Sequence, residues 1–196
     1  VYLGLDLSAT TDLTALVAVS AEDGERVAAW FWKPGDLLKQ HADRDRAPYV
    51  DWQQAGWIEA PPGRAVDYGF VARRIAEIAA DYEVVALAYD RWRIEALLRE
   101  LAAIGVDAFV DSKDDARTGA LRLVPWGQGW RDMAPAIDAL EISVLERRFQ
   151  HPGNPVLTFC FANAVSITDA SGNRKMDKSA TRFRIDGAVA AAMAIG

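Results

Sequence analysis

Hydrophobic and small or polar residues alternate along the first eight residues, the pattern of a β-strand with one buried face. The apolar face consists of Val1, Leu3, Leu5 and Leu7. The opposite face carries Asp6 between the small residues Gly4 and Ser8. An ionised carboxylate inside a strand built for burial needs a counter-charge or hydrogen bonds, because an unpaired buried charge is costly.

Two further apolar segments follow closely, at residues 13–23 and 24–35, and a turn is predicted between them around residues 22–25. Three strands with such short connections predict an antiparallel meander. Residues 34–63 are irregular and contain tryptophan, with short helices expected near 36–43 and 49–55.

The second half of the chain alternates between helix and strand patterns. Helices are predicted over residues 66–82, 91–105, 131–149 and 184–196, strands over 84–90 and 107–112, and a hairpin over 163–178. A meander followed by helix–strand units indicates a mixed α/β fold, in which parallel strands extend the meander and helices flank the sheet.

Composition fits this picture: 196 residues, 51% of them hydrophobic and 26% charged, suit a single domain over residues 1–196. No apolar run approaches the roughly 20 residues of a membrane helix. Cys160 is the one cysteine and His41 and His151 the two histidines, which favours a reducing compartment and disfavours a zinc site.

Charge argues against a generic nucleic-acid binder, since the net charge is -6. One local exception is the segment "NRKMDKSATRFR", in which five basic residues face the single acid Asp177. The segment is either a solvated loop or a surface that contacts phosphates.

Three aspartates lie on faces that otherwise look buried: Asp6 in the first strand, Asp90 at the end of strand 84–90, and Asp186 at the start of the last helix. Each has a structural explanation, because Asp6 could cap the following turn, Asp90 the next helix, and Asp186 could favour a helix N-terminus. Strand ends and helix starts of an α/β domain can also converge on one spot. Converging carboxylates repel unless cations lie between them, and oxygen ligands suit Mg²⁺ or Mn²⁺.

These residues resemble the C-terminal nuclease domain of the large terminase subunit of tailed bacteriophages, which has a ribonuclease H-like fold. The resemblance covers almost the whole chain and rests on "GLDLSATTDLTALV", "AYDRWRIEALLREL", "VPWGQGWRDMAPAIDALE", "HPGNPVLTFCFANAV" and "DKSATRFRIDGAVAAAMAIG". It implies a metal-dependent endonuclease that cuts concatemeric double-stranded DNA into genome units by hydrolysis with two ions, Mg²⁺ or Mn²⁺.

By motif, the acidic triad of the family falls on Asp6 in "GLDLS", Asp90 in "YDRW" and Asp186 in "RIDG". Asp12 is a further candidate metal ligand, although it could equally be a turn residue before the second strand. Lys175, Lys178 and Arg182 are expected to contact DNA phosphates ahead of Asp186. The "GQGW" segment at 127–130 lacks the Gly-Lys-Ser/Thr of a phosphate-binding loop and is expected to shape the rim of the site.

The chain contains no Walker A sequence, so the ATPase motor of a terminase is not expected in it. The start at Val1, within a strand, suggests a domain separated from a preceding motor. The resemblance implies the ATPase domain, the small terminase subunit and the portal protein as partners, with no membrane, and the host cell cytoplasm as location.

Two alternatives remain open from the sequence. "GLDLSATT" also has the outline of the phosphate-binding strand and turn of actin-like and sugar-kinase ATPases. A resolvase, an integrase-like strand-transfer enzyme or a non-catalytic DNA-docking module could use the same fold, and three acids serve each of its active versions.

Overall fold

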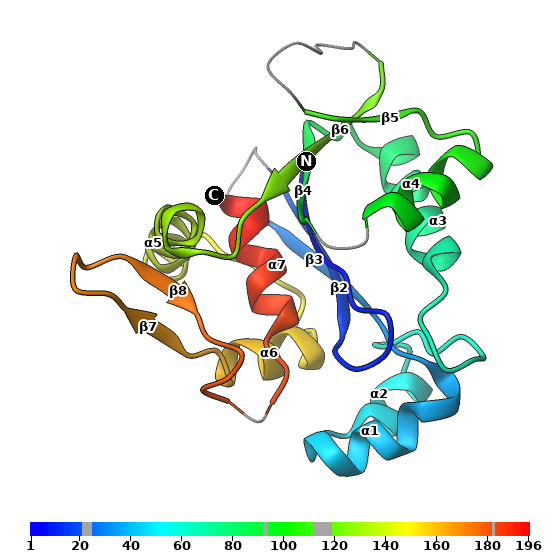
Figure 1. Ribbon diagram of the computed structural model, residues 1–196, viewed down its shortest axis with the longest axis horizontal. Coiled ribbons are helices and arrows are strands. Elements are labelled where there is room, and N and C mark those ends of the chain that lie inside the picture. The colour runs from blue at the N-terminus through cyan, green and yellow to red at the C-terminus, as the bar shows by residue number, and fades with distance from the viewer. Residues whose placement is uncertain (21–24, 92–93, 112–118, 182) are drawn as a thin grey trace.

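A computed structural model describes residues 1–20, 25–91, 94–111, 119–181 and 183–196. A six-stranded sheet in the order β3-β2-β1-β4-β6-β5 runs through these residues (Figure 1). The strands are β1 (Tyr2–Asp6), β2 (Thr14–Val19), β3 (Val27–Trp32), β4 (Ala86–Asp90), β5 (Ala108–Val110) and β6 (Leu121–Trp126).

The sheet is mixed, as the sequence predicts. β1, β2 and β3 form an antiparallel meander, and β4, β6 and β5 continue the sheet in parallel with β1. The turn predicted around residues 22–25 lies largely outside the described residues. This arrangement confirms the ribonuclease H-like mixed sheet.

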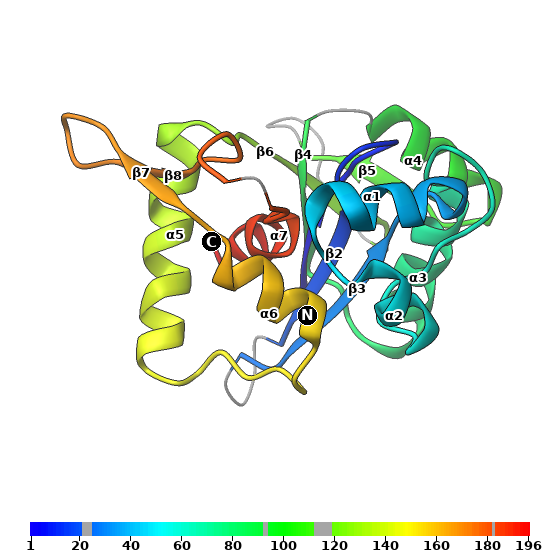
Figure 2. The same ribbon diagram turned by 90° about the horizontal axis from the view of Figure 1, so that it is seen from below.

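Helices cover both faces of the sheet (Figures 1 and 2). One face packs against α3 (Tyr68–Asp81) and α4 (Ile94–Ala103), and the other against α7 (Asp186–Ile195), with α5 (Trp130–Leu145) and α6 (Pro155–Ala162) outside it. The short helices η1 (Gly35–Leu37), α1 (Leu38–Asp45) and α2 (Tyr49–Gln54) follow β3. A hairpin of β7 (Ser166–Thr168) and β8 (Arg174–Met176) packs against α5 and projects from the molecule.

Side-chain caps mark the starts of two helices, α3 and α6. The Asp67 side chain accepts a hydrogen bond from the Gly69 amide at the start of α3. Asn154 accepts from the amides of Val156 and Leu157 at the start of α6. The sequence analysis did not predict α6, which begins at Pro155 with an almost uniformly apolar stretch, nor β6, which contains Pro125.

The alternation in β1 divides the core as expected. Leu3 and Leu5 point into the core under α3 and α4, whereas Gly4 and Asp6 face α7. A Cβ atom at Gly4 would lie 1.9 Å from the carbonyl oxygen of Ala190, so glycine permits the backbones of β1 and α7 to touch. Within the described residues, no helix combines the length and apolarity that a membrane crossing requires.

Candidate active site

The contact of β1 with α7 determines where two of the three predicted aspartates meet. Gly4 lies against Ala190 of α7, and α7 begins four residues earlier, at Asp186. Four helical residues rise about 6 Å and two strand residues about 6.6 Å. The two elements therefore bring Asp6, two residues after Gly4, beside Asp186.

Asp90 reaches the same end of the sheet on the neighbouring strand. β1 and β4 pair in parallel with Gly4 opposite Ala88, and Ala88 packs against the α7 residue Val189. Asp90, two residues further along, consequently lies level with Asp6 on the same face. Its Oδ2 accepts a hydrogen bond of 2.9 Å from the side-chain Nε2 of Gln128, which lies in the "GQGW" segment.

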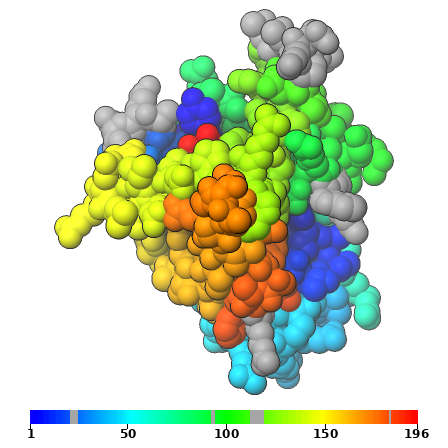
Figure 3. Space-filling view, turned by 60° about the vertical axis from the view of Figure 1, so that its left-hand side comes forward, coloured from blue at the N-terminus to red at the C-terminus, as the bar shows by residue number. Residues whose placement is uncertain are grey.

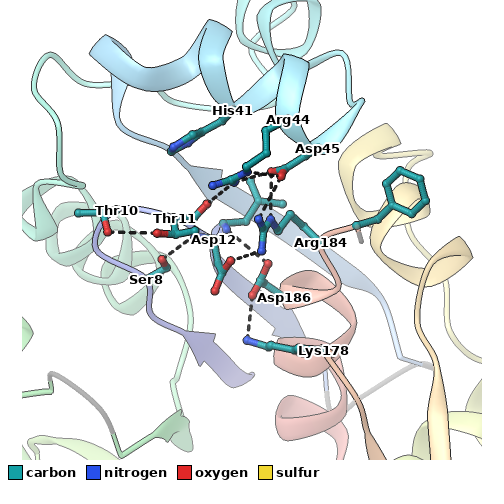
Figure 4. A network of polar contacts seen from close by, with 12 residues as sticks. Ser8, Thr10, Thr11, Asp12, His41, Arg44, Asp45, Lys178, Arg184 and Asp186 are labelled. Carbon is teal, nitrogen blue, oxygen red and sulfur yellow. Dashed lines mark hydrogen bonds and ion pairs between the residues drawn. The ribbon is translucent and has the colours of Figure 1, made fainter. Parts of the chain in front are cut away.

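Lys178 stands between the first two carboxylates. Its Nζ donates to Asp6 Oδ2 at 2.7 Å and to Asp186 Oδ1 at 2.9 Å. Figure 4 shows the contact with Asp186. The side chains of Asp6 and Asp186 are only 4% and 2% exposed, whereas that of Lys178 is 37% exposed. Asp186 also accepts a hydrogen bond from the Leu13 amide at 3.3 Å.

Burial and the pairing of opposite charges act in opposite directions on the pKa values of Asp6 and Lys178. Burial raises the pKa of the Asp6 carboxyl to about 7; Lys178 opposes this rise, while Asp186 and Asp90 add to it. Burial lowers the pKa of Lys178, but the two carboxylates outweigh it and hold this pKa above its ordinary value. The lysine therefore remains a cation between two buried acids.

A cavity of about 210 Å³ opens beside the carboxylates, lined by Asp6, Asp186, Lys178 and the β1–β2 loop (residues 7–12). At the surface, the dark blue start of the chain borders the orange segment around residue 178 (Figure 3). Ser8 closes the loop, because its Oγ accepts from the Asp12 amide at 3.0 Å. Since Ser8 caps this turn and Asp6 contacts Lys178, the turn does not require the Asp6 carboxylate.

Asp12, the fourth candidate, is paired with a cation from the segment before α7. The Arg184 guanidinium donates to Asp12, and its Nε and Nη2 each contact the Asp45 carboxylate at 3.0 Å. Arg44 donates to the same Asp45 and also to the Thr11 carbonyl at 2.9 Å. The loop and the start of α7 are thus tied together through Asp45 of α1 (Figure 4).

The Asp45 cluster is buried. Lys33, which is 0% exposed, lies 3.8 Å from Asp45 and contacts His41 Nδ1 at 3.4 Å. Burial lowers the pKa of Lys33 to about 8 and that of His41 to about 4. Burial alone would raise the pKa of Asp45, but hydrogen bonds from Arg44 and Arg184 hold it well below its ordinary value. Asp45 therefore provides a permanent negative charge behind the loop.

The candidate site residues predicted from the sequence are held by different partners in the structure. Among the residues that the structure describes, no three histidine, cysteine or acidic side chains form a ready-made metal cage. Asp6 and Asp186 converge on Lys178, Asp90 is held by Gln128, and Asp12 by Arg184. The ammonium of Lys175 lies 4.7 Å from the centre of the Trp130 ring. Arg182 lies outside the described residues.

Sequence reasoning missed two parts of the site. The contacts of the Lys178 side chain with the two carboxylates were not anticipated, and the contact with DNA phosphates expected of this residue stays a prediction. The cluster around the buried Asp45 was not anticipated, because its members lie in α1, just after β3 (Lys33) and just before α7 (Arg184), and no motif links them. The position of Arg184 two residues before Asp186 is the one signal that could have drawn attention to it.

The donor set suits a divalent metal ion. Asp6 and Asp186 offer carboxylate oxygens to a common point, and that point holds a positive charge in this structure. Asp90 adds a partly buried carboxylate on the adjacent strand. Hard, oxygen-only donors of this kind suit Mg²⁺ or Mn²⁺.

Comparisons with known proteins agree with this fold. The large terminase subunit of Enterobacteria phage HK97 is 46% identical over 197 residues, which cover 100% of this chain and 36% of that protein. Its crystal structure superposes with a TM-score of 0.85 at 44% identity, over 99% of this chain and 38% of that one. This chain thus spans little more than a third of the HK97 protein.

A structure of the large terminase nuclease from thermophilic phage G20c, determined with bound magnesium, superposes with a TM-score of 0.59. That match covers 99% of this chain and 79% of the other at 16% identity, so it supports the fold alone. Residues 1–196 also match the family described as terminase large subunit, endonuclease domain. The chain belongs to this family of terminase endonuclease domains.

Proposed function

We propose that this chain is a divalent-metal-dependent DNA endonuclease that cuts concatemeric double-stranded viral DNA during genome packaging. The observation that carries the proposal is the buried pair of Asp6 and Asp186, bridged by a cation at the end of the sheet. The nuclease of phage G20c has been crystallised with magnesium and with cobalt. The same chemistry fits the carboxylates of this chain.

In this proposal Asp6, Asp90 and Asp186 ligate two ions, Mg²⁺ or Mn²⁺, and Asp12 is a further candidate ligand. Two such ions, when bound, activate a water and stabilise the leaving oxygen of a phosphodiester. The chain itself supplies rigid placement of the donors. Asp6 and Asp90 end two neighbouring strands, and Asp186 begins a helix that is buried along nearly its whole length.

The polar neighbours orient these carboxylates. The backbone amide of Leu13 donates a hydrogen bond to one oxygen of Asp186, and the side-chain amide of Gln128 donates one to an oxygen of Asp90. Through Asp12, Arg184 links the cavity loop to the buried Asp45. These contacts restrict the orientations that the carboxylates can take.

DNA is proposed to approach the open side of the cavity and to contact Lys175, Lys178 and Arg182, which precede Asp186 in the sequence. A protein with a net charge of -6 binds DNA weakly by itself, so affinity is expected to depend on other parts of the terminase. We propose that residues 1–196 form the single nuclease domain of a longer terminase. Its partners would be the ATPase domain, the small terminase subunit and the portal protein in the host cytoplasm.

Cleavage of supercoiled plasmid tests this function. The wild-type chain is expected to nick and linearise plasmid with Mg²⁺ or Mn²⁺ but not with EDTA, and Asp186→Asn is expected to lose this activity. Asp169→Asn is a matched control, since Asp169 lies in the exposed hairpin turn. Normal cutting by Asp186→Asn would refute the assignment. Mg-ATP binding without any cleavage would instead favour the actin-like alternative.

A further inference from the structure

The inward position of Lys178 extends the proposed function, on which the following inference rests. We propose that Lys178 is a positioning residue that occupies the cation position of the metal-free site. It holds the carboxylates of Asp6 and Asp186 together, and it must leave them before both can ligate a metal ion.

The contacts support this role. One ammonium group donates to two carboxylates, at 2.7 Å and 2.9 Å, and both acids are buried. Two buried carboxylates would repel one another across this gap without a positive charge between them. Lys178 therefore supplies the positive charge between the two carboxylates that a bound metal ion would otherwise supply.

The lysine is also placed so that it can leave. Its side chain is 37% exposed, in contrast to the two acids. Its backbone belongs to a turn in which Asp177 accepts hydrogen bonds from the Ser179 amide and hydroxyl, and the Asp177 amide donates to the Val165 carbonyl. These contacts anchor the turn independently of the lysine side chain, so the side chain can swing outward while the turn stays.

Charge sets the direction of the exchange. Lys178 contributes one positive charge against the two negative charges of Asp6 and Asp186, so the trio retains a net negative charge when both acids are ionised. A divalent ion neutralises the pair more completely. The released ammonium then points towards the open side of the cavity, where it can contact a phosphate.

Lys175 provides a matched control in the same segment. It carries the same charge three residues earlier, but its ammonium packs over the Trp130 ring. Lys175→Met and Lys178→Met thus change the net charge of the protein equally. Only the second removes a competitor from between the carboxylates.

The experiment is a calorimetric titration of Mn²⁺, and separately Mg²⁺, into the metal-free chain. Lys178→Met is expected to bind Mn²⁺ about tenfold more tightly than the wild type, because two charge-assisted hydrogen bonds no longer compete. Lys175→Met is expected to match the wild type. Equal or weaker binding by Lys178→Met would overturn the proposal, since the ammonium would then not compete with the metal ion for the two carboxylates.

Thermal unfolding gives a second readout that needs no activity. In EDTA, Lys178→Met should unfold at a lower temperature than the wild type, and Mn²⁺ should raise its melting temperature by more. Lys178→Gln serves if the methionine variant does not fold. If the wild type and the Lys178 variant bind Mn²⁺ equally, the role proposed for Lys178 fails and the nuclease proposal stands. If neither binds a cation and Asp6→Asn changes nothing, the nuclease proposal itself fails.

Discussion

Replacing Gly4 by alanine should disturb stability and the candidate site together. The new Cβ atom would lie 1.9 Å from the Ala190 carbonyl oxygen and 2.9 Å from the Ala194 amide nitrogen. Because the obstacle is helix backbone, no side-chain rotation relieves it. β1 and α7 must separate by about 1.5 Å to restore an ordinary contact of 3.4 Å, and overpacking of this kind costs about 1–3 kcal/mol.

That displacement acts on the carboxylates directly, since Asp6 belongs to β1 and Asp186 to α7. A misplacement of about 1 Å at a catalytic site can cost roughly 100-fold in rate. We expect Gly4→Ala to lower the free energy of unfolding by about 1–3 kcal/mol and plasmid cleavage by about 100-fold.

Urea unfolding followed by circular dichroism measures the first effect, and a cleavage time course the second. Gly129→Ala is the control, because a Cβ atom there meets open space and its φ of -82° suits any residue. Gly129 precedes α5, so the control is expected to cost less than about 1 kcal/mol. Wild-type stability and cleavage in Gly4→Ala would refute the inference that this close approach builds the site.

Three further predictions concern the residues around the carboxylates. Burial gives His41 a folded pKa of about 4 against an ordinary 6.5, so its contribution to stability is present above pH 6.5 and is lost as the pH falls towards 4. Urea midpoints measured between pH 7 and 4 should show this loss, which is at most about 3 kcal/mol. The His41→Gln variant should lack this pH dependence. Asp45→Asn leaves the buried Lys33 without its carboxylate and should cost about 3–5 kcal/mol in urea unfolding, a result that wild-type stability would contradict. Gln128→Leu removes the hydrogen bond to Asp90 and should slow cleavage about 10-fold or more without changing the unfolding midpoint.

Much of the fold followed from the sequence because its elements carry local signals. The alternation in residues 1–8 assigned Gly4 and Asp6 to one face, and that face meets α7. Helix spacing and the capping residue Asp67 place α3 within the predicted range 66–82. Convergence of Asp6 with Asp186 could be anticipated, since strand ends and helix starts meet at one edge of such a sheet.

Other features depend on tertiary context. Pro125 argues against an inner strand, because proline cannot donate a backbone hydrogen bond. It nevertheless lies in β6, beyond the three residue pairs that join β6 to β5. At that position its nitrogen does not need to donate a hydrogen bond to β5. The α6 sequence has no amphipathic stripe, because its buried residues contact both β-sheet side chains and α7. The direction of the Lys178 side chain depends on the path of a turn, which a linear pattern does not contain.

Anomalous diffraction from crystals of the wild-type chain soaked in Mn²⁺ locates the metal without relying on activity. We expect manganese peaks between Asp6, Asp90 and Asp186, with the Lys178 ammonium displaced from the carboxylates of Asp6 and Asp186. Manganese bound elsewhere, or no peak at this edge of the sheet while Lys178 still bridges Asp6 and Asp186, would contradict this expectation.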